Sequence, residues 1–362
     1  MKYKRLVYVY VSSGAGPEKV SVNKLSQEPF VPLFKQEGFY YLFNRFIQES
    51  LFQEILVVME SGRSPGIITF DFPGITGVCV SNLSDLTPFM RADDLLWARG
   101  GWKSWCNFLS WWGSAHREIL FYRANTGNGR WPFWTVVLED TSPDIATIEV
   151  APTPEIPFAH RRLIYPFNKP IDPTIFFPDA GTPVYDLCIG ASHIHDKKNQ
   201  FSIIPVLLAY RKKYGKDLKC VLPGALHRGV NTNDLWPSIQ RHSLDITLPG
   251  MLPRQILAKE VYNRSRLYIH TAVGGQNDRG PLEALACGTS VMTYKYHNSP
   301  PFFKEIIPFV DLDNPETASE KIYISLEAEK KVDKKTVADS FTHFNGIENV
   351  IIPQFKKLIE ML

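Results

Sequence analysis

Residues 274–291 read GGQNDRGPLEALACGTSV, and this stretch decides the expected fold because its parts depend on one another. The apolar run 267–270 before it is expected to be a strand, followed by a polar, glycine-rich loop. A helix is expected to start at Pro281, since proline is favoured at the first helical position. Glu283 would lie in its first turn, where the helix dipole favours a carboxylate. A Cys-Gly-Thr turn then ends the helix and a further strand follows. A glycine-rich loop that leads into a helix N-terminus is an anion-binding arrangement.

From Pro281 to Val291 the stretch resembles the signature of the nucleotide-sugar glycosyltransferases with the GT-B fold, in particular the retaining family that includes sucrose and glycogen synthases. That family typically reads Glu-Gly-Phe-Gly-x-x-x-Leu-Glu-Ala-x-Ala-Cys-Gly-Thr-Pro-Val. At the position of its first Glu this chain has Gly275, and Asp278 offers a carboxylate from a shifted place. The resemblance implies an α/β fold with two Rossmann-like parallel-sheet domains that face a central cleft.

The composition is that of a folded protein with two domains. The chain has 362 residues, of which 44% are hydrophobic and 21% charged, which argues against wholesale disorder. A net charge of +3 is too small to indicate nucleic acid by itself, but it suits an anionic donor. The five cysteines are scattered without a CxxC pair, so we expect buried thiols in a reducing compartment and a cytoplasmic protein. The N-terminal apolar run is too short for a signal peptide, and no run approaches the ~18 apolar residues that span a membrane.

Short apolar runs alternate with helical segments, which predicts parallel α/β sheets. The strands expected in the first half are 6–11, 55–59, 67–70, 77–80, 94–97, 118–122 and 135–138, with helices at 39–53 and 102–112. The strands expected in the second half are 185–190, 219–222, 243–248, 267–270 and 291–294, with helices at 201–214, 253–265 and 350–362.

Prolines cluster between Pro152 and Pro183 and predict a connector between two domains. Residues 168–178 within it are similar to the junction Asn-x-x-Asp-x-x-x-Phe-x-Pro of the same glycosyltransferases, with one extra residue between Asn and Asp. The expected parts are an N-terminal Rossmann-like acceptor domain (1–165), a Pro-rich linker (166–182), a C-terminal Rossmann-like donor domain (183–345) and a last helix (346–362). The GT-B resemblance implies that this last helix packs back towards the N-terminal domain.

The resemblance also implies side chains for the charged parts of a nucleotide-sugar donor. The diphosphate would contact Lys197, Lys198 and Arg279, and Glu283 would accept hydrogen bonds from the ribose; these four are the expected catalytic residues. The family has Gly-Arg-x-x-x-x-Lys-Gly before the first helix of this domain, whereas here the Arg is replaced by Ala191 and the Lys comes one place late. The alternatives are a solvated basic turn for the two lysines and a purely capping role for Glu283.

Loops at strand ends would supply the remaining substrate contacts. These residues are Gly14, Ala15 and Gly16 after the first strand; Gly190, Ser192 and His193 after strand 185–190; Gly250, Met251 and Leu252, whose backbone would read the base; and Gly274, Gly275, Gln276, Asn277, Asp278, Gly280, Pro281 and Leu282 around the sugar. The His-x-His at 193–195 has no third ligand nearby, so no metal site is expected. No cofactor is expected besides the donor substrate.

The expected reaction is transfer of a sugar from a nucleoside diphosphate to an acceptor hydroxyl, which the resemblance implies to be retaining and independent of a metal. The alternatives are a sugar-nucleotide epimerase of the same fold and a non-catalytic relative that binds a nucleotide or glycan. A glycan or lipid-linked glycan is the expected acceptor. Seven of the eight tryptophans lie in the first half of the chain. They could simply form a bulky core, or they could form an acceptor platform for a sugar ring or a modified DNA base, or a patch for a membrane-surface glycolipid.

Overall fold

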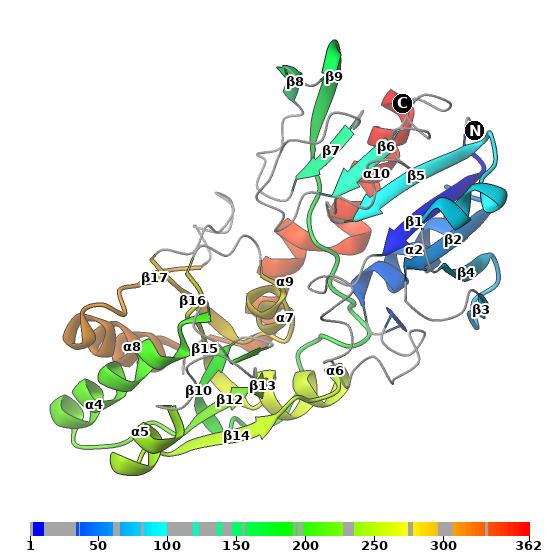
Figure 1. Cartoon of the computed structure of the whole chain (residues 1–362). Coiled ribbons are helices and arrows are strands. Elements are labelled where there is room, and N and C mark those ends of the chain that lie inside the picture. Colours follow the sequence, from blue (N-terminus) through cyan, green and yellow to red (C-terminus); the bar gives the residue numbers. More distant parts are fainter. Residues whose placement is uncertain are drawn as a thin grey trace. The chain divides into compact units, whose positions relative to one another are not determined.

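A computed structural model of the chain forms two compact units, which are Met1–Pro170 with Val350–Leu362 (unit 1) and Ile171–Asn349 (unit 2) (Figure 1). The residues it describes are 3–10, 34–35, 37–60, 66–80, 83–99, 119–122, 136–139, 147–153, 156–190, 193–194, 198–226, 235–273, 278–295, 307–329 and 332–362. No helix among them is both long and apolar enough to cross a membrane.

Unit 1 is built on one sheet of nine described strands in the order β3-β4-β2-β1-β5-β6-β7-β9-β8. Their bounds are β1 Arg5–Tyr10, β2 Glu54–Glu60, β3 Gly66–Thr69, β4 Ile75–Val80, β5 Asp94–Arg99, β6 Ile119–Tyr122, β7 Val136–Glu139, β8 Thr147–Thr153 and β9 Ile156–Pro166. The central strand β1 pairs in parallel with β2 and β5, and its residues 6–9 are fully buried. Such burial on both faces explains why the strand reads as a continuous apolar run.

The two edge strands of this sheet correct the expectation of a purely parallel arrangement. β3 pairs antiparallel with β4, and β8 pairs antiparallel with β9. The β8–β9 hairpin occupies residues that the prolines placed in a connector. Pro152 lies at an irregularity of the edge strand β8, and Pro157 is the second residue of β9. Proline is tolerated at bulges, edges and strand starts because it removes no ladder hydrogen bond there.

The C-terminal helix α10, Ile352–Met361, completes the core of unit 1. The ring of Phe355 lies 4.4 Å from that of Phe46 on helix α2, Gly38–Gln48, and 5.3 Å from that of Trp97 on β5. All three side chains are fully buried. Aromatic pairs at such distances stabilise a core beyond the area they bury. Unit 1 also contains a 3₁₀ segment, Leu83–Phe89. A π-helical turn, Ile347–Ile351, directly precedes α10.

Unit 2 is built on a parallel sheet whose six described strands lie in the order β14-β12-β10-β15-β16-β17. The bounds are β10 Tyr185–Gly190, β12 Cys220–Pro223, β14 Ile246–Gly250, β15 Ser265–His270, β16 Ser290–Tyr294 and β17 Phe309–Val310, and two-residue strands β11 His193–Ile194 and β13 Ala225–Leu226 pair separately. When the six strands are numbered along the chain, their order across the sheet is 3-2-1-4-5-6, which is the strand order of dinucleotide-binding folds. The strand alternation predicted for this half is confirmed.

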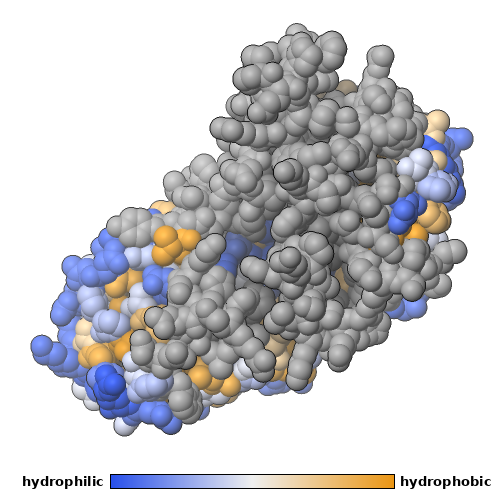
Figure 2. All heavy atoms as spheres, viewed as in Figure 1, coloured by the Kyte–Doolittle hydropathy of each residue, from blue (hydrophilic) through white to orange (hydrophobic). Residues whose placement is uncertain are grey.

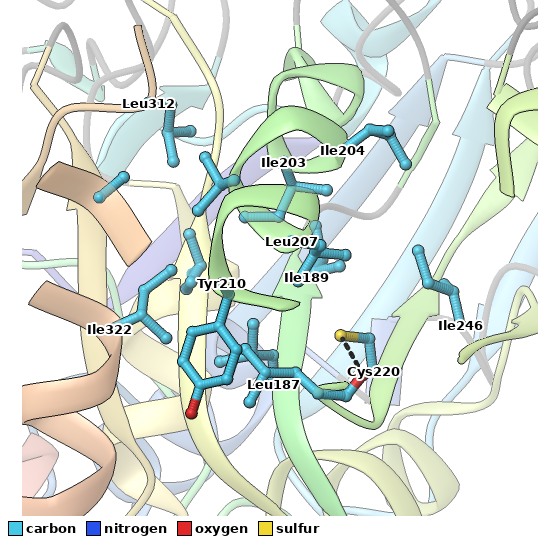
Figure 3. Close-up of a cluster of buried hydrophobic side chains, with 14 of the residues drawn as sticks. Leu187, Ile189, Ile203, Ile204, Leu207, Tyr210, Cys220, Ile246, Leu312 and Ile322 are labelled. Carbon is cyan, nitrogen blue, oxygen red and sulfur yellow. Dashed lines mark hydrogen bonds between the residues drawn. The ribbon is translucent and has the colours of Figure 1, made fainter. Parts of the chain in front are cut away.

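Helices cover both faces of this sheet. One layer contains α4 Ile203–Tyr214, α5 Leu235–Arg241 and α8 Pro315–Glu329, with a 3₁₀ turn Gln200–Ser202 before α4; the other contains α6 Arg254–Ile256 with the π-helical turn Leu257–Tyr262, α7 Arg279–Ala286 and α9 Lys334–Asn345. Figure 3 shows Ile203, Leu207 and Tyr210 of the first layer against Leu187 and Ile189 of β10. On the face seen in Figure 2, the described surface of this unit carries many hydrophilic residues with hydrophobic ones interspersed, as expected for helices that bury their apolar side.

Candidate functional site

The strand order of unit 2 reverses between β10 and β15, which lie side by side with Gly190 opposite His270. The next strands along the chain, β12 and β16, lie on opposite sides of this pair. The segments that follow β10 and β15 therefore diverge at the carboxyl edge of the sheet. Open parallel sheets bind their ligands at such a switch point. Lys198 follows β10 and Asp278 follows β15, so both reach the same edge.

Lys198, Asp278 and His270 form an ionic cluster at the switch point. Lys198 Nζ donates to Asp278 Oδ2 at 2.9 Å, and His270 Nε2 lies 2.8 Å from the same oxygen. Burial alone would raise the pKa of Asp278. The hydrogen bond and charge of His270, together with Lys198, outweigh burial and hold the pKa of this carboxyl well below its usual range. Thr271 fixes the backbone of the lysine, because its hydroxyl donates to the Lys198 carbonyl at 2.5 Å.

Tyr268 lies beneath this cluster and explains two of the expected glycines. A Cβ atom at Gly190 would lie 1.8 Å from the Tyr268 hydroxyl oxygen, and one at Gly280 would lie 2.3 Å from it. Burial raises the pKa of the Tyr268 hydroxyl well above its usual value, so it remains protonated. Within the described structure, these glycines leave room for a buried side chain of the protein itself.

Glu283 corrects the expected start of the helix. Helix α7 begins at Arg279 rather than Pro281, and no acidic residue lies in its first turn. Pro281 is its third residue, where a missing N–H still costs nothing because the first four N–H groups of a helix have no intrahelical partner. The side chain of Glu283 is 5% exposed and forms an ion pair with Arg254, whose Nη1 donates to Oε1. Tyr262 donates to Oε2 at 3.2 Å.

Comparison with known proteins gives a match of fold. No protein-family model matches the sequence, and no curated protein matches it. Among solved structures, HepE from Anabaena in complex with UDP is 13% identical, with a TM-score of 0.64 over 99% of this chain and 100% of that chain. An α,α-trehalose-phosphate synthase (UDP-forming) from Burkholderia xenovorans is 10% identical, with a TM-score of 0.64 over 99% and 100%. Sucrose-phosphate synthase from Thermosynechococcus elongatus is 12% identical, with a TM-score of 0.61 over 99% and 98%.

The chain has the GT-B fold. Nearly the whole length aligns, so the likeness includes both units rather than a single Rossmann-like domain. The fold expected from residues 281–291 is thereby confirmed, although the N-terminal sheet is mixed at its two edges.

Within this GT-B chain, the expected base-reading loop follows β14. Gly250 ends the strand at φ +76°, a conformation that favours glycine, and its carbonyl accepts from the Gly224 N–H at 2.8 Å. Met251 is exposed and Leu252 partly exposed. The loop lies at the carboxyl edge of the same sheet as the ionic cluster. Its role in reading a base stays a prediction.

The structure brings together only some of the predicted residues. Lys198, Asp278, Arg279, Gly280, Pro281, Leu282, Glu283 and Gly190 all lie in the segments after β10 and β15 or at their ends. His193 begins β11 and pairs with Ala225 of β13. Gly14, Ala15, Gly16, Ser192, Lys197, Gly274, Gly275, Gln276 and Asn277 lie outside the described residues, as does the segment 102–112 expected as a tryptophan-rich helix.

Sequence reasoning missed His270 and Arg254. In the sequence His270 is simply the last residue of the apolar run 267–270, yet its side chain is buried, with 1% exposure, and contacts Asp278. A histidine at the carboxyl end of a central parallel strand was the available signal. Arg254 begins α6 directly after the loop that follows β14, and its guanidinium contacts the carboxylate of Glu283. Among the described residues, no three His, Cys, Asp or Glu side chains form a metal-binding group.

Proposed function

We propose that this protein is a glycosyltransferase that moves a sugar from a nucleoside-diphosphate sugar to an acceptor hydroxyl. The observation that carries the proposal is the ionic cluster beside the N-terminus of α7, at the switch point of a GT-B chain. The neighbouring structures of the same fold include one with bound UDP and one with bound glucose-6-phosphate. Both are consistent with a diphosphate-bearing donor and a sugar acceptor.

In this proposal Lys198 and Arg279 stabilise the leaving diphosphate. Charge grows on that group as the glycosidic bond breaks, and preorganised cations and helix N–H groups lower the energy of the charged state. These cations would replace a divalent metal, so the transfer is proposed to proceed without one. Retention of configuration is proposed from the family resemblance of residues 281–291. No further cofactor is invoked.

Glu283 is proposed to accept hydrogen bonds from the ribose hydroxyls. Each carboxylate oxygen has two lone pairs, so Oε1 and Oε2 keep acceptor capacity beside Arg254 and Tyr262. A donor would therefore bind next to Arg254, which orients the Glu283 carboxylate.

The proposed acceptor is a carbohydrate or a glycolipid. The proposed location is the cytoplasm, and a glycolipid acceptor would add peripheral contact with a membrane. A nucleic acid acceptor predicts a salt-sensitive complex with duplex DNA. Absence of such a complex at low salt would remove that alternative.

The test is a thermal-shift screen of UDP, GDP, ADP, TDP and CMP against the wild type and Glu283→Ala. One nucleoside diphosphate is expected to raise the Tm of the wild type by mass action and to raise that of the variant less. That nucleotide names the donor class for an acceptor search. If none of them shifts the wild type, the transferase proposal fails.

A second candidate is a nucleotide-binding relative without turnover. It is favoured by the two ion pairs Lys198–Asp278 and Arg254–Glu283, in which side chains expected to bind the donor are already paired with another side chain of the protein. Hydrolysis or transfer of the matching nucleotide sugar separates the two candidates, because the relative would bind the nucleotide and release no sugar.

A further inference from the structure

Two different side chains hold the two oxygens of the Glu283 carboxylate. Arg254 Nη1 donates to Oε1, and the Tyr262 hydroxyl donates to Oε2 at 3.2 Å. The last torsion of a glutamate is broad, so one donor on one oxygen would leave the plane of the carboxylate loosely defined. Donors on both oxygens fix that plane. The 3.2 Å distance is long for an O–H···O bond, so Oε2 can still accept a shorter bond from a ligand.

A π-helical turn brings Tyr262 to the side of its helix that carries Arg254. Two turns of an α-helix take about seven residues, whereas Tyr262 comes eight residues after Arg254. The turn Leu257–Tyr262 takes up the additional residue, since the Asn263 N–H donates to the Ala258 carbonyl, five residues back, at 2.9 Å. Both side chains therefore reach the same carboxylate. Such π-helical turns occur frequently at functional sites.

The Tyr262 ring is held in place by its surroundings. It is buried, and its centroid lies 5.8 Å from that of Tyr268, edge to face, and 6.2 Å from that of Phe176. The Thr289 hydroxyl donates to the Tyr262 carbonyl at 2.6 Å. Burial, followed by the charge of Glu283, raises the pKa of Tyr262 well above its usual value. The hydroxyl therefore keeps its proton and remains a donor at neutral pH.

We propose that Tyr262 is the positioning residue that lets this protein distinguish ribonucleotides from deoxyribonucleotides. This inference rests on the proposed function, in which Glu283 accepts hydrogen bonds from the ribose hydroxyls. The two hydroxyls are on adjacent carbons, so a carboxylate held in the right plane meets one with each oxygen. Tyr262 acts only through Oε2, which it holds so that both bonds form together. A 2′-deoxy or 3′-deoxy sugar would leave one carboxylate oxygen without its partner, which costs binding free energy.

The experiment measures the Kd of UDP, 2′-deoxy-UDP and 3′-deoxy-UDP by calorimetry for the wild type, Tyr262→Phe and the matched control Tyr210→Phe. The same three forms of another diphosphate are used if the thermal-shift screen selects one. Phenylalanine keeps the buried ring and removes only the hydroxyl. Tyr210 is also buried, but it lies in the helix layer on the opposite face of the sheet from Glu283. A general loss of affinity changes all three Kd values together, so the ratio of deoxy to ribose Kd reports the fit to the ribose.

In the wild type, each deoxy form is expected to bind about tenfold more weakly than the ribose form, the effect of one hydrogen bond to a charged group. Tyr262→Phe is expected to lower at least one of these ratios to about threefold or less, because the carboxylate then loses one of its two holding donors. Tyr210→Phe should leave both ratios at the wild-type value. In the Glu283→Gln background, Tyr262→Phe should change neither ratio, since its effect passes through the carboxylate.

Wild-type ratios near one, ratios unchanged by Tyr262→Phe, or an equal fall with Tyr210→Phe would overturn the role of Tyr262 and leave nucleotide binding standing. If Tyr262→Phe does not fold, Phe176→Leu decides in its place, because it loosens the Tyr262 ring and keeps the hydroxyl. The same ratio is then expected to fall, and an unchanged ratio would overturn the role. Absence of wild-type binding to every diphosphate in the screen would overturn the proposed function as well.

Discussion

The two ends of the β10–β15 strand pair use the same ionic chemistry in opposite ways. At the amino end, Arg264 bonds Asp179 at 2.6 Å, and Arg266 bonds Asp186 and Glu329 at 3.1 Å each and also the Leu326 carbonyl. At the carboxyl end, Lys198 and His270 contact the same single oxygen of Asp278.

The difference lies in the cation. A guanidinium presents five donors in a fixed plane, so Arg266 joins several elements at once and ties α8 to the starts of β10 and β15. An ammonium is a point charge on a flexible stem, and one bond can be exchanged for another. The comparison teaches that the amino-end pairs hold the fold together, whereas the carboxyl-end pairs remain available to a ligand.

The largest expected effect concerns the glycines at the two ends. Gly190→Ala is expected to lower the free energy of unfolding by about 3 kcal/mol, because its Cβ would overlap the ring of Tyr268, which is fully buried and cannot yield. Gly181→Ala is expected to cost only about 1 kcal/mol, although its Cβ would lie 1.5 Å from Arg264 Nη1, because that flexible, partly exposed side chain can shift. Urea unfolding of both variants checks the order, and equal costs would break the comparison.

The second largest expected effect is a loss of stability when an arginine at the amino end is removed. Arg266→Ala is expected to lower the free energy of unfolding by about 2 kcal/mol, a figure reduced for the partial exposure of the side chain, with the Kd for nucleotide unchanged. Lys213→Ala serves as the control, since it removes an exposed ion pair with Glu320 of the same helix α8 and should change stability little. Weakened nucleotide binding by Arg266→Ala would show that the amino end also serves the ligand.

The converse change is made at the carboxyl end. Lys198→Ala is expected to weaken binding of the nucleoside diphosphate about tenfold, since a charge-assisted hydrogen bond contributes about 1.4 kcal/mol or more. It should unfold more nearly like the wild type than Arg266→Ala does. Lys212→Ala removes an equal charge from the exposed side of α4 and should leave the Kd unchanged. A tenfold loss with both lysines would indicate a general charge effect instead.

The smallest effect is the pH dependence of the carboxyl-end cluster. The pKa of Asp278 is lower in the folded state than its ordinary value, so its ionised form stabilises the fold at neutral pH, and that contribution is lost as pH falls below about 4. The stability difference between wild type and Asp278→Asn should therefore shrink as pH is lowered from about 5 to about 2. A difference that stays constant over this range would show that Asp278 acts through its shape rather than its charge.

Much of the fold is readable from the sequence because buried parallel strands appear as apolar runs. The run 185–190 coincides with β10, and 267–270 lies within β15. The β8–β9 hairpin is hard to predict because it contains prolines. A strand accepts proline only at a sheet edge, a bulge or its first residues, and the sequence alone does not show those positions. The sequence does not predict the helix start at Arg279, because proline is compatible with several positions in the first turn of a helix. The extended backbone of Asp278, which is seen only in the structure, fixes the start at Arg279.

The site was less readable because its contacts join distant residues. Lys198 and Asp278 could each be placed after a strand, but they are 80 residues apart and their ion pair depends on the adjacency of β10 and β15. Nothing in the segment around Arg254 indicates that its side chain reaches Glu283, 29 residues later.

The helix that closes the first unit is the last one in the chain. Phe355 fills an aromatic core whose other members come from α2, β5 and Phe167. During synthesis on the ribosome, unit 2 can therefore acquire its full set of strands and helices while unit 1 still exposes the cavity that α10 will fill. Unit 1 therefore joins segments that are far apart along the sequence, and removal of α10 is expected to expose the rings of Phe46 and Trp97 to water.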